Sequence, residues 1–396
     1  MKPAFAALAL MAATTGHASA QAVTVQGDLS NLTISGISSG AAMAVQYAVA
    51  HSASVAGVAS IAGPPWGCAH GSAAQAVNDC MCGGNPVAAQ VDRARDLAAD
   101  GKIAPLDQDG RPQGLKRAYV FQSPADNTVV EASGQTSARF LEEFIHRPVM
   151  PDKGNHADGS DRAGHGIISP RERGFAKDSC TATGFEHSYI RTCGAEDNPG
   201  KALAQLQEED YDRSRRVERP QGHLLGFDQQ AYVERVAADT PVAADPDLAS
   251  ILIPVADTSP SERRRNLDMD RRGFVYVPPQ CDGNATCRIH IALHGCKQDG
   301  ETFARHAGYN NWADRYGLIV VYPTIRQADT TAGEACLFRL PESKALDKMN
   351  PNGCWDWWGY LDPEDAAGRY VTKDAPQMRV IDAILTDLAN GTLMAN

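Results

Sequence analysis

The sequence predicts an α/β fold in which a single, mostly parallel sheet carries helices on both faces. Two parts of the chain, before residue 121 and after residue 273, alternate short apolar runs with helix-forming runs. Such alternation is typical of strands joined by crossover helices. The stretch between these parts is irregular, and one sheet can unite them. With 396 residues, 43% of them hydrophobic, the chain is long enough for a large common core.

The first part begins with a strand–helix–strand unit. Residues 32–37 (LTISGI) are β-prone, residues 41–50 (AAMAVQYAVA) favour a helix, and residues 55–62 (VAGVASIA) form a second apolar run. This order indicates a βαβ crossover in a parallel sheet. Further along, residues 87–100 show helical periodicity, and residues 117–121 are again β-prone.

The second part repeats the alternation after a polar, loop-like stretch at about 146–200. A charged, exposed helix is expected at 201–219, and 196–270 as a whole is the least certain segment. Regular structure is then expected in the order 273–277 (strand), 288–293 (strand), 303–316 (helix), 318–322 (strand) and 378–388 (helix).

Composition excludes several classes of protein. The chain has 37 basic and 48 acidic side chains, a net charge of −11. A nucleic-acid-binding protein would need a basic face that displaces counterions, so no nucleic-acid partner is expected. Beyond the N-terminus no apolar stretch reaches the roughly 18–20 residues of a membrane-spanning helix, so no membrane partner is expected either.

The N-terminus predicts export. Lys2 precedes a short apolar run at 4–13, and Ala18-Ser19-Ala20 provides the small residues that signal peptidase accepts. The alternative, a buried N-terminal helix, is less favoured because the run is short and ends in small and polar residues. We therefore expect a signal peptide at 1–20, a single domain over 21–396, and a secreted or periplasmic monomer.

Ten cysteines agree with an oxidising compartment. Their even number permits five disulfides, and Cys180/Cys193 and Cys281/Cys287 are close enough in sequence to be local pairs. Sequence alone does not fix the other pairs. A metal site around Cys80-Met81-Cys82 would need a further ligand at a suitable spacing, and none stands out. No metal and no cofactor are expected.

Residues 36–40 (GISSG) fit the Gly-x-Ser-x-Gly pattern between an expected strand and an expected helix. In that context the serine lies on a tight turn, and its hydroxyl projects beyond the end of the sheet as a nucleophile. The register selects Ser38 rather than Ser39. The alternative is a glycine-rich turn that carries two surface serines.

A serine nucleophile needs a histidine base, and the base needs a carboxylate that orients it. Asp126 follows the strand at 117–121, where the acid belongs, although an Asp–Asn pair is also a common turn signal. Four histidines follow it at plausible distances. We favour His165, which lies in a glycine-rich loop able to swing the ring towards the serine, and the alternatives are His156, His187 and His146.

An oxyanion-binding segment is expected after the triad instead of before it. The strand at 288–293 leads into His294-Gly295-Cys296, a pattern like the loop whose backbone N–H groups polarise a scissile carbonyl. We expect the N–H groups of Ser39 and Cys296 to be the donors and His294 to be structural. Circular permutation of an α/β-hydrolase explains the order, and it places the two termini close together.

Four segments carry a resemblance to a known family. They are 36–43 (GISSGAAM), 293–296 (LHGC), 308–314 (GYNNWAD) and 351–357 (PNGCWDW). Together they resemble the secreted poly(3-hydroxybutyrate) depolymerases with a circularly permuted catalytic domain, over about residues 25–390. The stretch 164–170 (GHGIISP) is also similar to the surroundings of that family's histidine.

The resemblance implies a triad of Ser38, Asp126 and His165, with the Cys296 amide in the oxyanion hole, and agrees with the choice made from the residues. It implies hydrolysis of the polyester or its oligomers through an acyl-enzyme. Many members append a polymer-binding domain, whereas this chain stops soon after its last helix, so amorphous polymer or oligomers are the expected substrates.

Apolar side chains must hold such a substrate. Trp66, Trp355 and Trp357 are the candidates, although aromatic clusters are more often core. Two other functions stay open: a carboxylesterase acting on acetylated or feruloylated polysaccharide, and a non-catalytic polyester-binding protein. A preference for the chain length of the substrate would distinguish a carboxylesterase from a depolymerase. The intact order of Ser, Asp and His in the sequence disfavours a non-catalytic binding protein.

Overall fold

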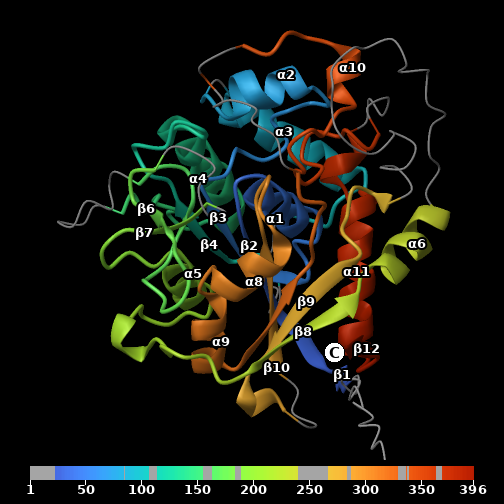
Figure 1. Cartoon of the computed structure of the whole chain (residues 1–396). Coiled ribbons are helices and arrows are strands. Elements are labelled where there is room, and N and C mark those ends of the chain that lie inside the picture. Colours follow the sequence, from blue (N-terminus) through green and yellow to red (C-terminus); the bar gives the residue numbers. More distant parts are fainter. Residues whose placement is uncertain are drawn as a thin grey trace, which may run out of the picture.

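The computed structural model describes residues 23–83, 85–106, 114–154, 163–182, 189–239, 266–282, 287–328, 336, 339–362 and 368–396. Nine strands of this part form one twisted sheet (Figure 1). Their order across the sheet is β1 (Val23–Val25), β12 (Leu393–Ala395), β8 (His223–Asp228), β9 (Arg272–Val277), β11 (Leu318–Tyr322), β10 (Cys287–Leu293), β2 (Gly27–Ile37), β3 (Val55–Ile61) and β4 (Arg117–Phe121).

The sheet confirms the α/β fold but is more mixed than expected. The five strands from β11 to β4 are parallel, whereas β9, β8, β12 and β1 are joined by antiparallel pairings. A second small sheet contains β5 (Ile167–Ile168), β7 (Ile190–Thr192) and β6 (Asp178–Ser179). Strands from both parts of the chain share the large sheet, as expected.

The pairing of strands fits the permuted order. β10, which precedes the His-Gly segment, lies directly beside β2, which precedes the serine turn, although the two are far apart in sequence. At the far edge β1 and β12 pair antiparallel, with Val23 opposite Ala395, so the described ends of the chain meet. The described residues of 196–270 belong to the same architecture, because they include β8.

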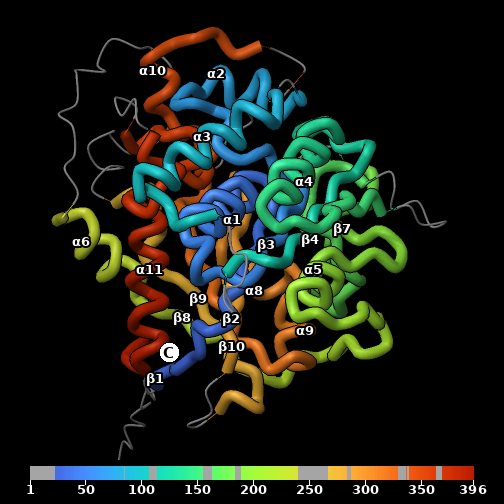
Figure 2. Tube along the Cα trace, turned by 180° about the vertical axis from the view of Figure 1, so that it is seen from behind, coloured from blue at the N-terminus to red at the C-terminus, as the bar shows by residue number. Residues whose placement is uncertain are grey.

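Helices cover both faces of the sheet (Figures 1 and 2). Alternate residues of a strand face opposite sides, and Ile34 and Ile37 of β2 enter different cores. The helices that pack on the face of Ile34 are α1 (Ser39–Ala50), α3 (Val87–Ala99), α4 (Glu131–Ile145), α6 (Gln230–Ala238) and α11 (Pro376–Ala389). The helices that pack on the face of Ile37 are α5 (Asn198–Leu206), α8 (Gly300–His306) and α9 (Tyr309–Tyr316). Shorter elements are α2 (Ala73–Gln75), α10 (Lys344–Asp347), the π turn Ala76–Cys80 and the 3-10 turns Arg213–Arg215, Pro279–Cys281 and Arg369–Val371.

Two expected helices differ from the structure. The helix expected at 303–316 is two helices, because Gly308 takes a left-handed φ of 103° between α8 and α9. The helix expected at 201–219 is α5, which ends at Leu206 before Glu208, where φ is 58°. It is also buried rather than exposed, because Ala202, Leu203 and Leu206 pack into the cores while the charged residues beyond Leu206 continue as turns.

All ten cysteines are paired. The structure confirms the local pairs Cys180–Cys193 and Cys281–Cys287. It adds Cys68–Cys80, Cys82–Cys336 and Cys296–Cys354, which excludes a thiolate site at 80–82. Five disulfides fit an oxidising compartment. Among the described residues no group of three or more His, Cys, Asp or Glu could hold a metal ion.

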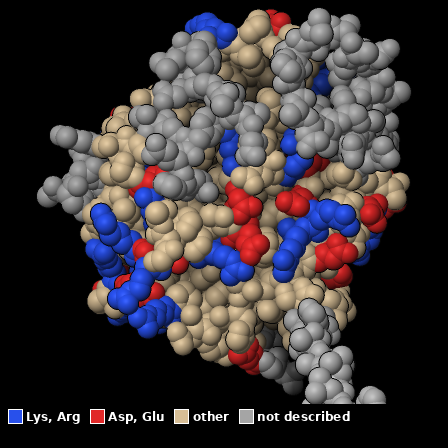
Figure 3. All heavy atoms as spheres, viewed as in Figure 1, with Lys and Arg blue, Asp and Glu red and all other residues tan. Residues whose placement is uncertain are grey.

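The described surface agrees with the composition. Figure 3 shows both acidic and basic side chains on the visible face. In the same described part of the chain, no helix combines the length and the apolar character that crossing a membrane requires. The expected signal peptide at 1–20 lies outside the described residues.

The pKa of a buried histidine predicts how stability depends on pH. His290 lies between hydroxyl groups of β2, with Nδ1 2.8 Å from Thr33 Oγ1 and Nε2 2.8 Å from Ser35 Oγ. Burial lowers the pKa of His290 from 6.5 to about 3. Between these values the unfolded chain binds more protons than the folded one. The free energy of unfolding should therefore fall as the pH drops below about 6.5.

A His290→Gln variant should show a shallower loss of stability with acid. The difference in slope should approach about 1.4 kcal/mol per pH unit, the value for one proton. Urea denaturation at several pH values between neutral and about 4 measures both proteins. Equal slopes in wild type and variant would show that His290 does not take up this proton on unfolding.

Candidate active site

The serine turn joins β2 to α1 at the carboxyl edge of the parallel strands. Ser38 has φ 56° and ψ −121°, a conformation that residues with a side chain rarely adopt. Hydrogen bonds hold it in place: Ser38 N–H donates to Ile61 O at 3.0 Å, and Ala42 N–H donates to Ser38 O at 3.0 Å. The Ser38 side chain stays partly exposed, while Ser39 is 2% exposed. Two surface serines, the alternative interpretation of this motif, are not found.

The two glycines of the motif are required by close backbone approach. A Cβ on Gly36 would lie 2.2 Å from Gly40 O. A Cβ on Gly40 would lie 2.4 Å from the carbonyl oxygens of both Leu293 and His294. Real Cβ atoms do not approach backbone this closely, so only glycine allows α1 to start directly against β10.

Asp126 and His165 lie in contact, although 39 positions separate them. His165 Nδ1 is 2.8 Å from Asp126 Oδ2, and both side chains are buried. The other carboxylate oxygen, Oδ1, accepts hydrogen bonds from the N–H groups of Thr128 (2.8 Å) and Val129 (2.9 Å). These bonds fix the carboxylate so that it can orient the imidazole, which leaves His165 Nε2 for another partner.

Strand register brings this pair to the same edge of the sheet as Ser38. Ile37 of β2 is level with Ile61 of β3, which is level with Phe121 of β4. The serine turn and the Asp126 loop therefore leave the sheet two strands apart, about 10 Å at the usual strand spacing.

The loop that carries His165 is tied down, whereas a flexible loop was expected. Arg191 Nε donates to His165 O at 2.7 Å, and Gly164 N–H donates to Cys180 O at 2.9 Å. A Cβ on Gly166 would lie 2.6 Å from Arg191 Nε, so the loop packs directly on this arginine. Arg191 is fully buried, and burial lowers its pKa. Sequence reasoning missed Arg191, since nothing in its neighbourhood marks it as buried.

Of the other candidate histidines, the structure describes His146 alone. His146 is exposed and ends α4 in a left-handed conformation. His156 and His187 lie outside the described residues.

The His-Gly segment lies against the serine turn. A Cβ on Gly295 would be 3.2 Å from Ser38 Cβ. The loop is held from both sides, because Gly295 N–H donates to Gln298 Oε1 at 2.6 Å and Lys297 N–H donates to Asn352 O at 2.9 Å. Within the described part of the chain, the N–H groups of Ser39 and Cys296 have no hydrogen-bond partner. Two such donors beside one serine can bind an oxyanion.

The three tryptophans are packed in the interior. Trp66 is 1% exposed and stacks on Phe140 with 5.1 Å between ring centroids. Trp355 is fully buried, and its Nε1–H donates to His294 O at 2.8 Å. Trp357 is 5% exposed. This burial favours the core alternative for Trp66 and Trp355, and contact of any of the three with substrate stays a prediction.

Comparisons with known proteins find similarity to poly(3-hydroxybutyrate) depolymerases. Residues 272–348 match the family described as Esterase PHB depolymerase. The poly(3-hydroxybutyrate) depolymerase of Delftia acidovorans is 29% identical over 98% of this chain, which spans 65% of that relative's length. The polyhydroxybutyrate depolymerase of Talaromyces funiculosus is 39% identical over 97 residues, 23% of this chain and 26% of its own.

Solved structures show the same fold. A PHB depolymerase complexed with R3HB trimer has a TM-score of 0.66 at 23% identity, and the similarity covers 93% of this chain and 98% of that one. The PHB depolymerase from Penicillium funiculosum has a TM-score of 0.65 with the same identity and coverage. The α/β fold of this chain is thus the fold of these depolymerases.

Proposed function

We propose that this chain, a relative of the poly(3-hydroxybutyrate) depolymerases in sequence and fold, is a serine esterase that hydrolyses poly(3-hydroxybutyrate) or its oligomers. The observation that carries the proposal is the contact of His165 with Asp126 at 2.8 Å, at the sheet edge where Ser38 lies against Gly295. This arrangement offers a nucleophile, an oriented base and backbone donors, the three parts that acyl transfer needs.

In the proposed acylation step, His165 Nε2 takes the proton of Ser38 Oγ as that oxygen attacks an ester carbonyl. Asp126 holds His165 in the tautomer with the proton on Nδ1 and stabilises the imidazolium that forms. The N–H groups of Ser39 and Cys296 bind the oxyanion. The tetrahedral intermediate collapses, the alcohol end of the substrate leaves with the proton from His165, and the acyl group stays on Ser38.

Deacylation uses the same groups in reverse. His165 takes a proton from water, the water oxygen attacks the acyl carbonyl, and Ser38 leaves with the proton that His165 returns to it. The product is a hydroxyacid or a shorter oligomer. No step uses a cofactor.

The similarity to a depolymerase complexed with R3HB trimer supports short oligomers as substrates. Five disulfides and the signal sequence expected at 1–20 support a secreted or periplasmic location. We propose that the mature protein acts there as a monomer.

Clearing of an amorphous poly(3-hydroxybutyrate) suspension tests the function. The mature wild-type protein should clear the suspension and release hydroxybutyrate or its oligomers, and a Ser38→Ala variant should not. Hydrolysis of short p-nitrophenyl esters without clearing would indicate that the substrate is an oligomer or an acetylated or feruloylated polysaccharide instead of the polymer. Absence of both activities in folded protein would overturn the esterase function and favour a polyester-binding protein.

A further inference from the structure

His294 uses both of its ring nitrogens, and their partners define its tautomer. Ile325 N–H donates to His294 Nε2 at 3.1 Å, so Nε2 carries a lone pair and no proton. Nδ1 therefore carries the proton, and it donates to Gly295 O at 2.9 Å. The ring is 1% exposed, and burial lowers the pKa of His294 from 6.5 to about 4, so it is neutral at neutral pH.

This bond determines where the next amide points. Gly295 C=O and Cys296 N–H belong to one planar, trans peptide unit and point in opposite directions. When His294 holds the carbonyl on one side, the Cys296 N–H is directed to the other. Gly295 lies against Ser38, and the Cys296 N–H is without a partner in the described residues.

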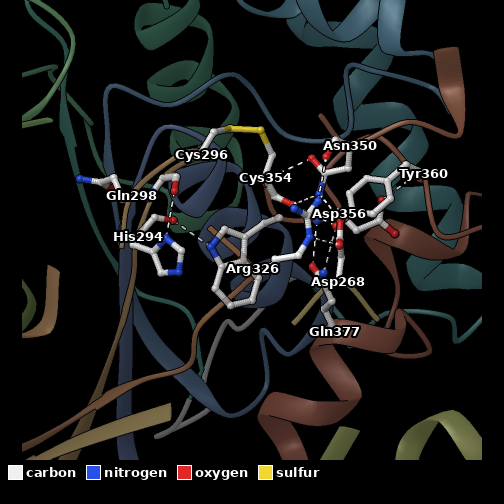
Figure 4. Close-up of a disulfide and its surroundings, with 12 residues drawn as sticks. Asp268, His294, Cys296, Gln298, Arg326, Asn350, Cys354, Asp356, Tyr360 and Gln377 are labelled. Carbon is white, nitrogen blue, oxygen red and sulfur yellow. Dashed lines mark hydrogen bonds and ion pairs between the residues drawn. A yellow bond between two sulfur atoms is a disulfide. The ribbon is translucent and has the colours of Figure 1, made fainter. Parts of the chain in front are cut away.

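The disulfide partner of Cys296 is also anchored (Figure 4). Cys354 N–H donates to Asn350 Oδ1 at 2.8 Å, and Asn350 Nδ2–H donates to Cys354 O at 2.9 Å. Asn350 in turn donates to Asp268, which pairs with Arg326 at 3.1 Å. The sulfur end of Cys296 is thus fixed by a buried network, and its amide end is fixed through His294.

We propose that His294 is a positioning residue for the oxyanion hole: its neutral ring orients the Gly295–Cys296 peptide so that Cys296 N–H faces the reacting carbonyl. This role rests on the proposed function. It requires that loss of His294 reduces kcat more than it raises KM, because the oxyanion develops only in the transition state.

Two substitutions distinguish the bond from His294 Nδ1 to Gly295 O, which orients the peptide, from the bond between His294 Nε2 and Ile325 N–H, which only attaches the loop. In His294→Asn the side-chain amide can place an N–H near the position of Nδ1 but does not reach Ile325. In His294→Gln the side-chain oxygen can reach Ile325 N–H, but no donor lies near Nδ1. The proposal predicts that the Asn variant keeps kcat within about tenfold, while the Gln variant loses about 100- to 1,000-fold in kcat with little change in KM.

The experiment measures kcat and KM on a soluble hydroxybutyrate oligomer, with circular dichroism and thermal unfolding as checks of folding. His294→Leu replaces His294→Gln if the latter does not fold. Equal kcat in both variants, the reverse order, or a change in KM alone would overturn the role of His294. Absence of hydrolysis by the wild type itself would instead overturn the proposed function, and with it this role.

Discussion

Replacement of Ser38 by alanine should lower kcat for ester hydrolysis by about a millionfold, the typical effect of removing a serine nucleophile. Without Oγ no acyl-enzyme forms, and only binding and the two backbone donors remain. The fold should survive, because the bonds that hold the turn use the backbone N–H and C=O of Ser38. Release of acid from a soluble hydroxybutyrate oligomer, followed at constant pH, measures the effect.

Ser39→Ala is the matched control, one position away. Ser39 is 2% exposed, and its Oγ has no hydrogen-bond partner among the described residues, so the substitution removes a hydroxyl that holds nothing in place. Its backbone N–H, the proposed oxyanion donor, remains. Substantial activity is expected. Loss of activity in Ser39→Ala but not in Ser38→Ala would overturn the register of the motif.

Asp126→Asn should lower kcat by about 10,000-fold while the protein stays folded. Asp126 Oδ2 lies 2.8 Å from His165 Nδ1, and the other carboxylate oxygen is fixed by two backbone N–H groups. In the variant the two backbone N–H groups retain the amide oxygen as their acceptor, so the NH₂ group faces His165 Nδ1. The imidazole then accepts at Nδ1 and adopts the wrong tautomer. Initial rates with saturating oligomer measure the effect.

His165→Ala should remove turnover as well, and Asp126→Asn combined with His165→Ala should cost little more than His165→Ala alone, since the two act as a unit. His156→Ala is the control and should retain turnover. If the His165 and His156 variants are equally active, His165 is not the base.

Local patterns were enough to predict the serine turn. Residues 32–50 combine a β-prone run, closely spaced glycines and a helix-forming run, and all three act over a few positions. The place of Asp126 in a loop at the end of a strand was also predictable, because residues 117–121 are recognisable as a strand. The prediction of His165 as the base was weaker, since four histidines had suitable spacing in the sequence. The contact between His165 and Asp126 is seen only in the fold.

Long-range features were not predictable from a single sequence. The partners of Cys82 and Cys296 depend on loops that meet only in the folded chain. In the sequence nothing distinguishes Arg191 from a surface arginine. In the fold it lies in β7 and donates a hydrogen bond to the backbone of His165. The sequence does not distinguish a tryptophan in a core from one in a binding cleft, so only the structure shows that Trp66 is buried.

The Cys82–Cys336 disulfide closes a loop over 254 positions. A single proteolytic cut between these cysteines would leave two polypeptides that remain covalently joined, at an effective mutual concentration in the millimolar range for a short tether. A cut between His165 and Cys296 would put the proposed nucleophile and the proposed base on one fragment and a proposed oxyanion donor on the other. Nicked protein would still migrate as one band without reductant, and only reduction would let the two fragments separate.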